Sequence, residues 1–121
     1  MNFANFNFSE PIFIIPFLTG LTYLAAGWYM NKYPAKKINP TSGYKTALSM
    51  KNQKNWDFAQ KYSPLVITKS GLAVLASSLL AFVTEFDEIV GSVIGLAIVI
   101  AGGIYPIIKT DRAIKEMNEL N

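Results

Sequence analysis

The residues that could do chemistry lie in one polar stretch, Asn39–Tyr62, which separates two strongly apolar parts of the chain. It reads NPTSGYKTALSMKNQKNWDFAQKY and supplies hydroxyl, carboxamide and ammonium groups. The chain contains no histidine and no cysteine, so imidazole and thiol chemistry and the usual zinc sites are excluded. Serine–lysine pairs stay open from sequence alone. We expect a protein that binds rather than catalyses, with no catalytic residue, no cofactor and no metal.

The beginning of this stretch has the composition of a turn, and its end has that of a helix. Asn39, Pro40 and Gly43 are residue types that form turns. Ser49 is a favourable N-cap, and no proline or glycine follows it before residue 62. We therefore predict a cytoplasmic amphipathic helix between the first two membrane spans, lying on the membrane surface. Simple anchoring to anionic lipid is the plainer interpretation of its lysines.

The rest of the chain is apolar enough to surround this stretch with membrane helices. Half of the 121 residues are hydrophobic and 16% are charged, against about 25% charged in soluble domains. Residues 11–30 and 89–108 carry no charge, and residues 64–83 carry only Lys69. About 20 apolar residues span a hydrocarbon core. We predict an all-α integral membrane protein, one domain over residues 1–121, with spans at about 11–31, 64–83 and 89–109 and a motif segment at 34–62. A soluble bundle of buried helices is the alternative.

The charged residues predict which side each connection faces. Residues 32–61 contain seven lysines and one acid, whereas residues 84–88 (TEFDE) contain three acids and no base. Lysine-rich connections stay on the inner side of bacterial membranes. We expect a multi-pass protein of the bacterial cytoplasmic membrane with its N-terminus outside and its C-terminus in the cytoplasm.

Three further features leave alternatives open. Lys69 either reaches back to the headgroups or is a functional intramembrane charge. Gly91 and Gly95 form a Gly-x-x-x-Gly pair, which packs the hairpin of the last two spans or forms a homo-oligomer face. The three acids of the second connection could bind a cation, but they are more simply a solvated loop.

The polar stretch resembles the motif of the SdpI family of small bacterial membrane proteins. The family pattern runs Asn-Pro, Gly-Tyr-Arg-Thr, Ser, Asn, Trp and Ala-Asn, and this chain reproduces its spacing. The matching residues are Asn39-Pro40, Gly43-Tyr44-Lys45-Thr46, Ser49-Met50, Asn52, Asn55-Trp56, Ala59 and Tyr62. The motif covers about residues 38–83, and the hydrophobic layout covers the whole chain. Two positions depart from this pattern. Lys45 replaces an arginine, so the planar two-pronged donor of the guanidinium group is lost. Gln60 replaces an asparagine.

The resemblance implies a role in immunity to, or sensing of, a membrane-active peptide toxin, with a cytoplasmic transcriptional repressor as a further partner. It implies a functional motif consisting of Asn39, Pro40, Gly43, Tyr44, Lys45, Thr46, Ser49, Asn52 and Trp56. The alternative function is a small oligomeric transporter or channel subunit. We expect no nucleic-acid partner, because the basic connection is held against a membrane.

Overall fold

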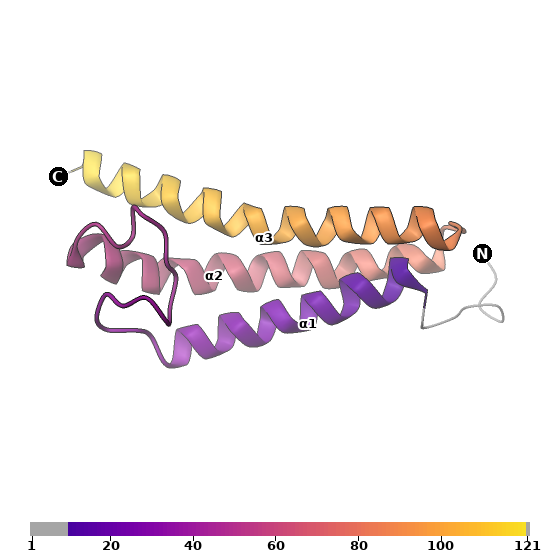
Figure 1. Ribbon diagram of the computed structural model, residues 1–121, viewed down its shortest axis with the longest axis horizontal. Coiled ribbons are helices and arrows are strands. Elements are labelled where there is room, and N and C mark those ends of the chain that lie inside the picture. The colour runs from indigo at the N-terminus through magenta and orange to yellow at the C-terminus, as the bar shows by residue number, and fades with distance from the viewer. Residues whose placement is uncertain (1–9, 121) are drawn as a thin grey trace.

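Three long helices run side by side, and the polar stretch folds over one end of them (Figure 1). The computed structural model describes residues 10–120. Its elements are α1 (Pro11–Lys32), α2 (Gln53–Ser77), the short 3-10 helix η2 (Ser78–Phe82) that continues α2, and α3 (Glu88–Glu119). The prediction of an all-helical chain with three apolar helices is confirmed.

Each long helix has the length and composition needed to cross a membrane. Large apolar side chains cover the outside of the bundle, among them Leu18, Leu72, Leu79, Val93, Leu96 and Ile100. Such a surface is unfavourable in water and suited to a hydrocarbon environment.

The helices approach each other most closely at glycines. A Cβ atom on Gly20 of α1 would lie 2.7 Å from the backbone nitrogen of Leu75 in α2, so no side chain fits there. Gly91 and Gly95 of α3 also pack within the chain, but their contacts are to the start of α1 instead of to α2. Small residues let helix backbones approach closely, which is how helices associate in lipid.

A proline inside α3 is compensated by α2. Pro106 has no N–H group, so the carbonyl of Gly102, four residues earlier, lacks its usual donor within the helix. The hydroxyl of Ser70 in α2 donates a hydrogen bond to that carbonyl. The bond ties α2 to α3 in the apolar part of the bundle, where no water can satisfy the group.

The predicted cytoplasmic amphipathic helix is wrong as a separate element. The helix begins at Gln53, is capped by Asn52 rather than Ser49, and continues as α2 through Pro64 to Ser77. Nothing breaks the helix where the polar stretch meets the apolar span. Its first turns bury Asn55, Trp56, Ala59 and Gln60 instead of presenting one face to lipid.

Candidate functional site

We call residues 33–52, between α1 and α2, the connector. Its first part contains a turn that the Asn39 side chain stabilises. The Asn39 Oδ1 atom accepts hydrogen bonds from the backbone N–H groups of Thr41 at 3.0 Å and Ser42 at 2.8 Å. Pro40 is exposed within this turn. These two motif residues therefore shape the connector locally, as their turn-forming character predicts.

Gly43 then brings the backbone against α2. Its φ angle is +85°, a conformation that glycine adopts readily and other residues rarely. A Cβ atom here would lie 2.5 Å from the Oε1 atom of Gln60. Both the backbone angle and the available space thus require glycine at this position.

The side chain of Gln60 holds the backbone of the next residue, Tyr44. Gln60 Oε1 accepts a hydrogen bond from the Tyr44 N–H group at 2.8 Å, and Gln60 Nε2 donates to the Tyr44 carbonyl at 2.9 Å. The two bonds resemble the pairing of neighbouring strands. Gln60 is buried, so water competes little for either bond.

Tyr44 reaches from the connector to α3. Its hydroxyl contacts the Oδ1 atom of Asp111 at 2.8 Å and the carbonyl oxygen of Ile107 at 3.0 Å. Burial raises the pKa of the Tyr44 hydroxyl well above its usual value, and the neighbouring Asp111 carboxylate raises it further. The hydroxyl therefore stays protonated and acts as a hydrogen-bond donor.

Thr46 makes the second contact between the connector and the same carboxylate. Its hydroxyl donates to Asp111 Oδ1 at 2.9 Å. Two hydroxyl groups, both from the Gly-Tyr-Lys-Thr run, thus converge on one oxygen of α3. Lys45, between them, is exposed to solvent.

Ser49 closes a tight turn instead of starting a helix. Its hydroxyl accepts from the Thr46 N–H group at 2.9 Å and donates toward the Tyr44 carbonyl at 3.2 Å. The Ser49 N–H group donates back to the Thr46 hydroxyl at 3.1 Å. Ser49 has no exposed surface, so this reciprocal pair lies inside the fold.

The end of the connector is fixed by the first turn of α2. The Asn52 side chain accepts from the Asn55 N–H group, and Asn55 Nδ2 donates to the Leu48 carbonyl at 2.9 Å. Trp56 is fully buried, and its Nε1 atom donates to the carbonyl of Ala35 at 2.8 Å. Trp56 therefore ties the start of the connector to the helix at its end.

The structure brings five of the nine predicted motif residues into one hydrogen-bonded network around the connector: the buried or half-buried Tyr44, Thr46, Ser49 and Trp56, and the exposed Asn52. Asn39, Pro40 and Gly43 set the backbone, and Lys45 points to solvent. Lys69 is exposed on the outer surface of α2 and takes no part in this network.

Sequence reasoning missed the partners of the motif. Asn55 was noted as part of the motif and Gln60 as a departure from it, but neither was predicted to hold the connector. Asp111 was not predicted as a site residue at all. The signal that could have pointed to it is its position just beyond the third apolar segment, on the side where the lysine-rich connection lies.

The network can position the connector, and its composition offers little for a reaction. The hydroxyl groups of Tyr44, Thr46 and Ser49 are engaged with fixed acceptors. Within residues 10–120 no group of three or more His, Cys, Asp or Glu residues could hold a metal ion.

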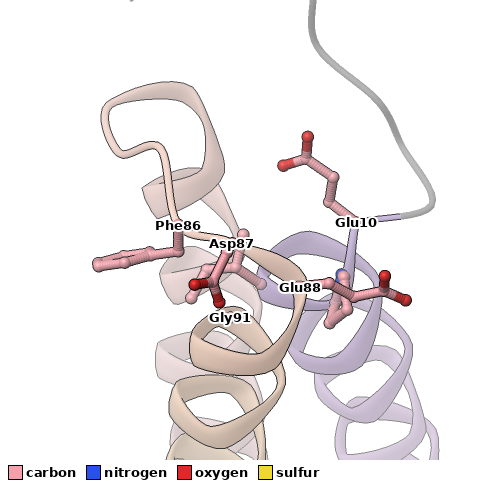
Figure 2. A pocket seen from close by; sticks show the side chains of 7 residues that line it. Glu10, Phe86, Asp87, Glu88 and Gly91 are labelled. Carbon is pink, nitrogen blue, oxygen red and sulfur yellow. The ribbon is translucent and has the colours of Figure 1, made fainter.

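A concave feature lies at the end of the bundle opposite the connector. It has a volume of about 240 Å³ and lies between the start of α1 and the start of α3. Glu10, Asp87 and Glu88 line it, and Figure 2 shows their carboxylates pointing in different directions. Asp87 is also the N-cap of α3, accepting from the Val90 N–H group at 2.8 Å. The alternative of a cation site on the acids of residues 84–88 therefore gains no support from the two of them, Asp87 and Glu88, that line this feature.

Comparison with known proteins gives one family and one related protein. Residues 36–110 match the model of the SdpI/YfhL protein family, a stretch that runs from the connector almost to the Asp111 contact. The uncharacterized protein YfhL of Bacillus subtilis (strain 168) is 30% identical over 104 residues, which are 83% of this chain and 89% of that protein. No solved structure matches.

Proposed function

The chain belongs to the SdpI/YfhL protein family, and from that premise we propose that it gives immunity to, or senses, a membrane-active peptide toxin by binding rather than catalysis. Its three apolar helices agree with a multi-pass membrane protein of this family. The family resemblance supports the immunity role, and the hydrogen-bonded network around the connector supports binding rather than catalysis.

We propose that the connector faces the cytoplasm. The connector and the C-terminal end of α3 lie at the same end of the bundle (Figure 1). Seven lysines between residues 32 and 61, together with Lys109, Arg112 and Lys115, make this end basic. The other end carries Glu10 and the acidic 84–88 connection. The positive-inside rule then places the basic end in the cytoplasm and the acidic end outside.

The observation that carries the sensing role is the continuity of α3. This helix begins at the outer acidic end and reaches Asp111 at the connector without interruption. The part from Glu88 to Asp111 corresponds to about 35 Å along the helix axis. A peptide that inserts beside the outer helix ends would displace α3, and Tyr44 and Thr46 would pass the displacement to the connector. The connector then serves as the docking surface for a cytoplasmic repressor.

The alternative of a small oligomeric transporter or channel subunit has less support. Intramembrane charges that serve transport face a bundle interior or a water-filled cavity. Lys69 instead lies on the outside of α2. Gly91 and Gly95, for which an oligomer face was the alternative to packing within the chain, are occupied by α1.

The test is survival of the native bacterium under toxin challenge. We would compare the parent, a deletion strain and deletion strains expressing either the wild-type chain or Asp111→Ala, all exposed to secreted membrane-active peptides. The proposal expects sensitivity after deletion, rescue by the wild-type chain and poor rescue by Asp111→Ala. Tyr33→Phe, at an exposed tyrosine, is the control and should restore survival fully. Equal survival of parent and deletion strains would count against the proposal.

A further inference from the structure

An open groove runs between α2 and α3 in the part of the bundle that crosses the membrane. It has a volume of about 520 Å³, and most of its exposed lining is apolar. Its walls are Ser70, Ala73 and Val74 from α2 and Ile98, Ala101 and Gly102 from α3, with Lys69 and Tyr105 at its edge. The groove is separate from the connector network and plays no part in the proposed toxin response.

The groove has a basic end. The Gly102 carbonyl accepts a hydrogen bond from the Ser70 hydroxyl. Lys69, next to Ser70 on α2, therefore lies at about the same depth in the bundle as Gly102 on α3. Lys109 follows Gly102 by seven residues, or about 10 Å along the helix axis. At about 100° per residue, Lys109 and Arg112 fall within the arc of α3 that lines the groove. Both are exposed, so their cationic groups extend the groove toward the connector end of the bundle.

We propose that this groove binds one anionic phospholipid. An acyl chain lies along the alanine and glycine wall, and the phosphate is held between Lys69 and Lys109 near the Tyr105 hydroxyl. Lysine side chains near the ends of membrane helices extend toward the headgroups, and a phosphate is the anion they meet there. Lys69 and Lys109 lie about 10 Å apart along the helix axis. Their side chains are long enough for both ammonium groups to reach one phosphate between them.

Charge favours a lipid over a second copy of the chain as the occupant. A two-fold contact brings the same patch of both subunits together. Two Lys69 residues would then meet in an apolar environment. Residues 11–31, 64–83 and 89–108 contain no acid that could pair with them. An anionic lipid supplies the missing negative charge.

The test is native mass spectrometry of the purified chain in a mild detergent. Phosphatidylglycerol and phosphatidylcholine with identical acyl chains are added separately, and the bound fractions are compared. We expect one tightly bound phosphatidylglycerol molecule per chain. Its affinity should exceed that of phosphatidylcholine by about tenfold, which is what one hydrogen bond to a charged group provides. Lys69→Gln should remove the preference, and Lys69→Arg should keep it.

Two further variants separate the groove from general surface charge. Ala101→Phe fills the groove while leaving every charge in place, and it should weaken binding of both lipids. Lys61→Gln removes an exposed lysine of α2 outside the groove and should change nothing. Equal binding of the two lipids by the wild-type chain, an unchanged preference in Lys69→Gln, or a lipid-free dimer would each overturn the proposal.

Discussion

The hydroxyl of Tyr44 and the carboxylate of Asp111 lie 67 residues apart in the sequence and 2.8 Å apart in the structure. The first residue belongs to the connector and the second to the last helix. Their hydrogen bond joins the family motif to a helix that runs to the opposite end of the molecule. The motif therefore has a structural role: it holds the connector in one position against α2 and α3.

Gly43→Ala should destabilise the chain by about 1–3 kcal/mol, because a residue with a Cβ atom is strained at this φ angle and meets Gln60. Unfolding by SDS in mixed detergent micelles measures the loss. Gly91→Ala is the matched control: its Cβ atom would make an ordinary 3.6 Å contact with Ile12. The control should be neutral or slightly stabilising. Equal stability of Gly43→Ala and the wild-type chain would contradict the assigned role of Gly43.

The two tryptophans should report opposite environments. Trp56 has no exposed surface, whereas Trp28 is 59% exposed at the end of α1. In the variant Trp28→Phe, the remaining fluorescence from Trp56 should be blue-shifted and protected from acrylamide. The reciprocal variant Trp56→Phe, with Trp28 alone, should be quenched more strongly and should lose about 1–2 kcal/mol of stability with the bond to Ala35. Equal quenching of the two variants would show that the connector does not cover Trp56.

Alkaline pH should weaken the fold through Tyr44. Its pKa is raised above the ordinary value of 10.0 by burial and by Asp111. The protonated hydroxyl therefore contributes stability that is fully present below about pH 10 and is lost as the pH rises through the raised pKa. Absorbance at 295 nm, which follows tyrosine ionisation, should show a late component that Tyr44→Phe lacks and Tyr33→Phe keeps. A late component that survives in Tyr44→Phe would have to come from another tyrosine.

The helices could be predicted from the sequence because their signal is local. Two runs of 20 residues without charge, and a third with one lysine, suffice to predict membrane spans. The start of α2 was predicted less well. Ser49 and Asn52 are both good capping residues. Ser49 is instead held in a turn by its hydrogen bonds with Tyr44 and Thr46, five and three residues earlier, and Asn52 takes the cap.

The packing and the partners of the motif could not be predicted because they depend on residues far apart in the chain. The Gly-x-x-x-Gly pair drew attention to α3, yet the closest approach of a glycine to the backbone of another helix joins Gly20 to Leu75. Neither residue belongs to a small-residue repeat. The position of Asp111 just beyond the third apolar segment places it at the connector end, but nothing near it in the sequence pairs it with Tyr44 and Thr46. The functional role of the nine motif residues stays a prediction.

The most direct test of the connector's attachment to α3 is a double-mutant cycle on Tyr44 and Asp111. Tyr44→Phe, Asp111→Ala and the double variant are unfolded under identical detergent conditions, and their free energies of unfolding are compared with that of the wild-type chain. The account predicts that the double variant loses about 1–3 kcal/mol less than the sum of the single variants, because each single change already breaks the shared hydrogen bond. Losses that add to within about 0.5 kcal/mol would show that the two residues act independently and would contradict the account.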